Sequence, residues 1–240
     1  MYRNRTYRNL VQTDRLISFK ANVNETDLSI HALSQLEDVA KKSILRHRGY
    51  IEVFIKQHPE FLNSLYPLQI NEPSPAIIRD MANAGANAGV GPMAAVAGAI
   101  AKNVGLDLLS CSEEIIVENG GDIFIKTNKP VTVGIFAGAS PLSMRIGLHI
   151  KKTGKPVSVC TSSGTIGHSL SFGQADAVSV FSDSCSLADA AATSIGNRIG
   201  SINDIEKGIE FGKTIKGVQG LIIIVNDKIG IWGDLEIVRI

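Results

Sequence analysis

The spacing of apolar positions divides the chain into helical and extended stretches. Apolar residues recur every three or four positions over residues 33–65, a period that predicts helix. A second helical section is predicted from Pro75, because proline is typical of a first helical turn. Over residues 92–101 nearly every side chain is small or apolar, so this helix is expected to be buried on most sides. Two further helices are predicted near residues 186–198 and 203–213.

Short apolar runs bounded by polar turns predict strands in the rest of the chain. Residues 5–32 have the pattern of a meander of strands, and the later strands are predicted at 115–117, 123–125, 131–136, 144–150, 157–160, 177–181, 221–225 and 229–238. Helices and hairpin strands come in separate runs, which favours an α+β layered fold with mostly antiparallel sheets and packed helices. With no repeat and no linker, residues 1–240 are expected to form a single domain, or two intimate lobes.

Composition and charge exclude several classes of protein. Hydrophobic residues make up 44% and charged residues 20%, as in an ordinary globular chain. The net charge of +1 argues against nucleic-acid binding. No stretch reaches the roughly 18 apolar residues of a membrane span, and the first 20 residues lack the apolar core of a secretory signal. We therefore expect a cytoplasmic protein with no membrane partner.

The three cysteines, Cys111, Cys160 and Cys185, lack the spacing of metal ligands. Their odd number also argues against a disulfide framework. We expect them to be small buried residues.

Residues 186–193 have the pattern of a helix start that could hold a metal ion. The spacing places the Asp189 carboxylate and the Thr193 hydroxyl one turn apart on the same face. Two such oxygens suit Mg²⁺, which combines a few protein oxygens with substrate phosphate. Ser186 followed by Asp189 is also a capping box, which needs no chemistry. Both interpretations stay open, because one carboxylate has several lone pairs.

Two glycine-rich segments could approach a ligand closely. The segment 85–91 precedes a helix and ends at Gly91, so it could offer backbone N–H groups to a phosphate, or it could be a hinge between packed helices. Asn119-Gly120 is typical of a two-residue hairpin turn. Gly121 exceeds what that turn requires and would admit a ligand, with Asp122 beside it, although a turn alone is the competing interpretation.

The segment that follows the strand at 157–160 concentrates hydroxyls, glycines and an imidazole. Thr161, Ser162 and Gly164 could cradle a phosphate, and His168 could act as a general acid or base beside a hydroxyl. No acidic partner for His168 is evident nearby, so a catalytic triad is unsupported. A polar loop without chemistry is the alternative.

The order of these motifs resembles that of the ApbE family. A glycine-containing helix start is followed by Asn-Gly-Gly-Asp, by Thr-Ser-Ser-Gly and by Ala-Asp-x-x-x-Thr. Members of that family are flavin transferases, which use FAD and Mg²⁺ to attach FMN through a phosphoester to Thr or Ser of a target protein. The whole chain is more similar to the uncharacterised, ApbE-like protein family numbered 0280, found mainly in anaerobic archaea and bacteria. The supporting stretches are residues 25–30, 90–98, 118–122, 161–169 and 188–193.

The resemblance implies a role for each candidate residue. Asp189 and Thr193 correspond to the Mg²⁺-ligand pair, completed by a backbone carbonyl near Ala94 or Ala95. The segment that lines the flavin-nucleotide site corresponds to Asn119, Gly120, Gly121 and Asp122. The Thr-Ser-Gly that follows a core strand corresponds to Thr161, Ser162 and Gly164. The glycine at the helix start is Gly91. The His-x-x-Asp-Pro-x-Thr-Gly segment of the transferases is missing, because residues 167–173 contain no Asp-Pro. His168 is the candidate catalytic residue in its place.

Three functions are therefore compared. The first is a metal-dependent enzyme that acts on a small phosphate-bearing molecule, with Mg²⁺ and FAD or FMN as expected cofactors and FMN transfer or other phosphate-ester chemistry as its reaction. The second is a flavin- or nucleotide-binding protein without catalysis. The third is a sulfur-assimilation factor using Cys160 or Cys185, because relatives of this branch have been linked to sulfur assimilation in anaerobes. Whether the chain is an enzyme, and whether it forms a homo-oligomer, stays open from sequence.

Overall fold

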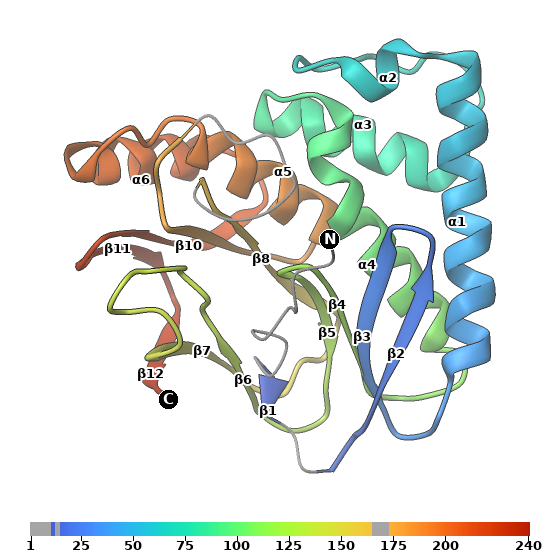
Figure 1. Cartoon of the computed structure of the whole chain (residues 1–240), viewed down its shortest axis with the longest axis horizontal. Helices are drawn as coiled ribbons and strands as arrows, with labels where there is room; N and C mark the ends of the chain where they lie inside the picture. The colour runs from blue at the N-terminus through green and yellow to red at the C-terminus, as the bar shows by residue number, and fades with distance from the viewer. Residues whose placement is uncertain (1–10, 13–14, 165–172) are drawn as a thin grey trace.

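The molecule is built from three layers, seen edge-on in Figure 1. The computed structural model describes residues 11–12, 15–164 and 173–240. An eight-stranded sheet runs through the middle, with helices on one face and a four-stranded sheet on the other. The predicted α+β fold with antiparallel sheets and packed helices is confirmed.

The large sheet has the order β11-β10-β9-β8-β5-β4-β3-β2, with each neighbouring pair antiparallel. Its strands are β2 (Ile17–Val23), β3 (Thr26–Ala32), β4 (Ile115–Asn119), β5 (Asp122–Lys126), β8 (Val157–Ser162), β9 (Ala177–Ser182), β10 (Val218–Val225) and β11 (Lys228–Gly233). The central strands are buried on both faces because both faces are covered.

The small sheet has the order β1-β6-β7-β12, formed by β1 (Val11–Gln12), β6 (Val131–Gly134), β7 (Ile146–Ile150) and β12 (Glu236–Arg239). Val133 and Leu148 of this sheet pack against Ile123 and Val159 of the large sheet. The prediction of one strand over residues 229–238 is wrong, because β11 and β12 belong to different sheets. Gly233 ends β11 with a φ of 99°, a conformation that lets the chain leave the large sheet.

The helices bury their apolar faces on the other side of the large sheet. They are α1 (Glu37–Gln57), α2 (Glu60–Asn63), α3 (Ala76–Ala88), the 3₁₀ turn η1 (Pro92–Ala95), α4 (Val96–Leu108), α5 (Cys185–Gly196), η2 (Ile202–Asp204) and α6 (Ile205–Thr214). Residues such as Leu28, Ile44 and Ile78 form the core between the layers. The predicted helix break at 85–91 needs correction, because α3 continues through Gly85 and ends at Ala88, with Gly89 as its C-cap at a φ of 72°.

Among the described helices, none is long and apolar enough to cross a membrane by itself. The segments Ala76–Ala88 and Pro92–Leu108 reach that length and composition only together, as a pair bent by 105°.

Candidate functional site

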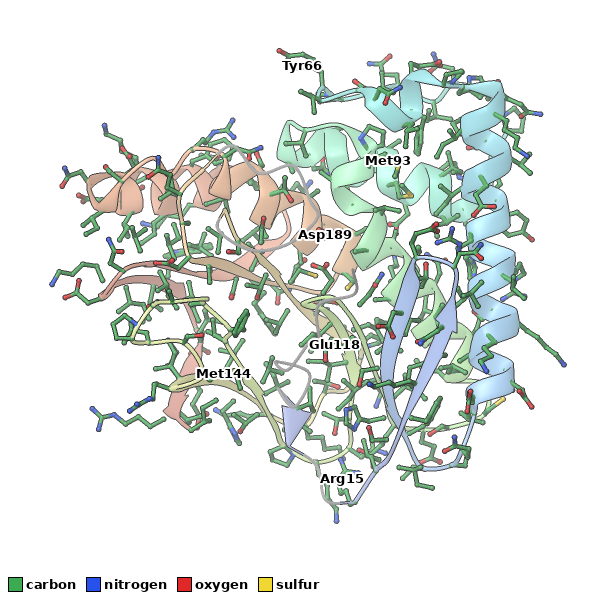
Figure 2. All side chains as sticks on the ribbon, in the orientation of Figure 1. Arg15, Tyr66, Met93, Glu118, Met144 and Asp189 are labelled. Carbon is green, nitrogen blue, oxygen red and sulfur yellow. The ribbon has the colours of Figure 1, made fainter. Side chains whose placement is uncertain are left out.

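Asp189 lies where α4 and α5 approach each other, near the centre of the view in Figure 2. Its Oδ2 accepts a hydrogen bond of 2.8 Å from the Gly98 amide, and the Ala97 amide adds a second bond. Both amides belong to the first turn of α4, where N–H groups have no partner inside their own helix. The carboxylate of one helix therefore caps the N-terminus of another, and it benefits from the positive end of the α4 dipole.

Glycine makes this close approach of the two helices possible. A Cβ on Gly98 would lie 2.4 Å from the Cys185 carbonyl oxygen and 2.9 Å from the Cβ of Asp189. The absence of a side chain lets α5 lie directly against the start of α4. Sequence patterns missed Gly98, because nothing near it in the chain shows what it packs against.

The capping box predicted for Ser186 and Asp189 is wrong. Helix α5 begins one residue earlier, and Ser184 caps it by accepting from the Leu187 amide at 3.4 Å. The Ser186 hydroxyl instead donates to Asp80 of α3, which also forms an ion pair of 2.8 Å with Lys102. Asp189 caps a helix, but the helix is α4.

Asp122 is a buried carboxylate close to the half-buried Asp189. It is the first residue of β5, is 8% exposed, and lies opposite Cys160 in the β5–β8 ladder. Burial raises the pKa of Asp122 well above its ordinary value, and the neighbouring charge of Asp189 raises it further. Burial likewise raises the pKa of Asp189 to about 7, although its bonds from Gly98 and Ala97 oppose the rise. We call Asp122, Asp189 and the first turn of α4 the carboxylate site.

The β4–β5 hairpin brings Asn119 to the same place. The Asn119 side-chain amide donates to the Ala97 carbonyl oxygen at 3.0 Å, which joins the hairpin to α4. The predicted hairpin is present, but Gly120 and Gly121 are its two central residues, with φ values of 69° and 115°. Gly121 is therefore required by the turn and is not an addition to it.

Strand β8 separates two of the predicted residues onto opposite faces of the sheet. Cys160 and Ser162 share the face that packs against the helices, whereas the Thr161 hydroxyl lies 2.8 Å from the Ser179 hydroxyl on the other face. Ser162 is therefore on the side of the carboxylate site, and Thr161 is not. The Gly164 amide just after β8 donates to the Ala175 carbonyl oxygen at 2.9 Å.

The remaining candidates have different settings. The Gly91 amide donates to the Leu65 carbonyl oxygen at 3.0 Å, so it already has a partner within the fold and a phosphate would use other amides. Thr193 is half-buried on α5, one turn after Asp189. His168 lies outside the described residues, and its predicted role stays a prediction.

Two cavities in the described part of the molecule lie elsewhere, along α1. One, of about 370 Å³, is lined by residues that include Phe54, His58 and Phe61. The other, of about 470 Å³, includes Tyr50 and Val53 in its lining. Neither contains a residue predicted for the site.

Comparisons with known proteins identify the family to which the chain belongs. The family model described as AbpE bacteria matches residues 8–231. The UPF0280 protein of Methanococcus aeolicus is 42% identical over 226 residues, covering 92% of this chain and 91% of that protein. The UPF0280 protein of Methanocaldococcus jannaschii is 43% identical over 206 residues, covering 83% and 84%. This chain belongs to the ApbE-like UPF0280 family. The resemblance drawn from its motifs is confirmed.

Solved ApbE structures share the fold of this UPF0280 chain at low sequence identity. The apo flavinyl transferase ApbE of Pseudomonas stutzeri superposes with a TM-score of 0.55 at 13% identity, covering 90% of this chain and 93% of that one. The ApbE protein of Thermotoga maritima gives 0.55 at 14%, covering 90% and 96%. These similarities establish the fold and leave the reaction to be argued from the site.

The raised pKa of Asp189 predicts how the stability of the metal-free UPF0280 chain depends on pH. Its ordinary value is 3.8 and its folded value about 7, so between them the native state holds a proton that the unfolded chain has lost. Unfolding releases that proton, and the free energy of unfolding therefore falls as pH rises from about 4 to about 7. We expect a fall of about 1–2 kcal/mol from this group, measured by urea unfolding in EDTA.

Asp189→Asn should flatten this part of the profile. Asp183→Asn is the matched control, because the Asp183 carboxylate is exposed and its pKa is lowered by Lys155. If the free energy of unfolding changes equally with pH in the wild type and in Asp189→Asn, the raised pKa of Asp189 is contradicted.

Proposed function

We propose that this chain is a Mg²⁺-dependent enzyme of the FMN-transfer type that acts on FAD. The observation that carries the proposal is the pair of carboxylates, Asp122 and Asp189, beside the first turn of α4. The largest influences on the two pKa values are burial, neighbouring acidic and cysteine side chains, and the backbone amides of Gly98 and Ala97. Such a pair requires either protons or a cation to balance its charge.

The oxygen donors fit Mg²⁺ better than a softer metal. In the described part of the chain, no three His, Cys, Asp or Glu side chains are grouped to enclose an ion. An ion held by Asp189 and Thr193 would complete its coordination with backbone carbonyls, water and substrate phosphate, as Mg²⁺ commonly does. When bound there, Mg²⁺ would neutralise the phosphate charge that opposes attack on phosphorus.

The other residues of the site support binding of a nucleotide. Asn119 and Ser162 present an amide and a hydroxyl on the helix-facing side of the sheet, where they would orient phosphate or ribose oxygens. Because the pKa of Asp122 is raised well above its ordinary value, a cation bound nearby would favour its charged form, and metal loading would release protons. By resemblance, His168 would exchange the proton of the acceptor hydroxyl as that oxygen bonds to the FMN phosphorus and AMP departs.

The fold shared with flavin transferases supports the same reaction class. The proposal is tested by measuring the release of AMP from FAD. Purified protein is incubated with FAD and Mg²⁺ or with FAD and EDTA, where the FMN group passes to a hydroxyl of the protein or to water. AMP, free FMN and FMN-modified protein are then measured by chromatography and intact mass. We expect AMP only with Mg²⁺. FAD binding without AMP would support the non-catalytic alternative, and absence of both FAD and Mg²⁺ binding would overturn the proposal.

A further inference from the structure

Two buried cysteines meet directly beside the carboxylate site. Cys160 of β8 and Cys185, the first residue of α5, have their sulfur atoms 3.6 Å apart. Their side chains are 0% and 1% exposed. The Cys160 thiol also donates to the Cys185 carbonyl oxygen at 3.4 Å. The two positions are far apart in the sequence, so only the packing of α5 on β8 brings the thiols together.

We propose that Cys160 and Cys185 form a reversible disulfide that switches off cation binding at the carboxylate site. Closing the bond shortens the sulfur separation to about 2.05 Å, a movement of roughly 1.5 Å in a well-packed core. This proposal rests on the proposed function only for its consequence, because the formation of the disulfide is independent of it.

The contacts of Cys185 transmit that movement to Asp189. The Cys185 carbonyl lies directly against Gly98, where even a Cβ atom would lie 2.4 Å from the oxygen. Gly98 in turn supplies the amide that holds the Asp189 carboxylate. A shift of the first turn of α5 must therefore displace either this hydrogen bond or the start of α4, because neither side has free space.

The second consequence concerns Asp122. This residue lies directly opposite Cys160 in the β5–β8 ladder. A movement of the Cys160 sulfur therefore changes the packing beside the Asp122 carboxyl, which is 8% exposed. Both carboxylates of the site are thus perturbed by one covalent change.

The oxidant is hydrogen peroxide or a small organic disulfide. Burial raises the pKa of the Cys160 thiol well above its ordinary value, so the Cys185 sulfur is the first nucleophile. With peroxide, the Cys185 thiolate attacks an oxygen, the O–O bond breaks, and hydroxide leaves to become water, which gives a sulfenic acid. The sulfur of the other cysteine then attacks that sulfur, the S–O bond breaks, and a second water carries away the thiol proton. Two thiols lose two electrons in total, and one peroxide accepts them.

The experiment treats reduced full-length protein with stoichiometric peroxide and maps its disulfides by mass spectrometry without reduction. We expect the free thiols to fall from three to one, with a Cys160–Cys185 bond that dithiothreitol reverses. The expectation that all three cysteines are buried is wrong for Cys111, which is exposed. Cys111→Ser is therefore the matched control, because this thiol should not be needed. Cys160→Ala and Cys185→Ala should each abolish the bond.

Two readouts separate the switch from the proposed function. Calorimetry should show at least a tenfold weaker Mg²⁺ affinity after oxidation, restored by dithiothreitol. Hydrogen exchange at the Ala97 and Gly98 amides should become at least tenfold faster, whether or not Mg²⁺ binds.

If Mg²⁺ fails to bind the reduced protein but hydrogen exchange still changes, only the proposed function is overturned. If Cys160 and Cys185 stay reduced while Cys111 reacts, or the bond forms with no change in exchange, the switch is overturned.

Discussion

Replacing Asp189 with asparagine is expected to abolish measurable Mg²⁺ binding and to lower AMP release from FAD about a hundredfold or more. Asparagine keeps an oxygen that can accept the Gly98 hydrogen bond, which is 2.8 Å long in the native protein. It removes the negative charge on which a hard cation depends. The variant should therefore fold and lose function. Mg²⁺ calorimetry and the AMP assay measure the two effects.

The control for this prediction is Asp183→Asn, two residues before the start of α5. Asp183 is exposed and paired with Lys155, so its loss should leave Mg²⁺ binding and AMP release unchanged. If Asp189→Asn binds Mg²⁺ as tightly as Asp183→Asn, Asp189 only caps α4.

The second large effect is expected from Gly98→Ala. The new methyl group would lie 2.4 Å from the Cys185 carbonyl oxygen and 2.9 Å from the Asp189 Cβ, so α4 and α5 must move apart. We expect the free energy of unfolding to fall by about 2–4 kcal/mol, as in overpacked cores. Mg²⁺ affinity should fall as well, because the amide that holds Asp189 moves with the helix. Chemical denaturation and calorimetry measure these changes.

Gly49→Ala separates this steric effect from the general effect of alanine in a helix. Gly49 is within α1 and has no atom within 4 Å of the position that a Cβ would take. Alanine there should raise stability by about 0.5–1 kcal/mol through helix propensity. Similar changes from the two substitutions would contradict the close packing inferred at Gly98.

Local patterns were sufficient for most elements of this fold. The helical period found α1, and a proline at the right position marked the start of α3. Short apolar runs located the central strands, since these signals depend on neighbouring residues along the chain. The same patterns failed over residues 229–238, where one predicted strand is divided between β11 and β12. The division depends on which sheet each half pairs with.

The candidate site shows a similar limit. The sequence singled out Asp122 and Asp189, and motif order placed them in one family, but neither fact says which groups surround them. Thr161 and Ser162 are adjacent in the chain, yet the alternation along β8 sends their hydroxyls to opposite faces. The structure puts Ser162 on the helix-facing side of the sheet and gives Thr161 a partner in Ser179 on the other side.

By itself, the sequence determined the periodicity of the helices and strands, the glycine turn between β4 and β5, and membership of the UPF0280 family. Each of these features depends on residues that are close along the chain or on the order of short motifs. Only the tertiary structure decided that Asp189 caps α4, through a hydrogen bond to a residue 91 positions away. The same packing joins Cys160 to Cys185 and raises the pKa of both carboxylates, because close approach and burial arise only when α4, α5 and the sheet fold together.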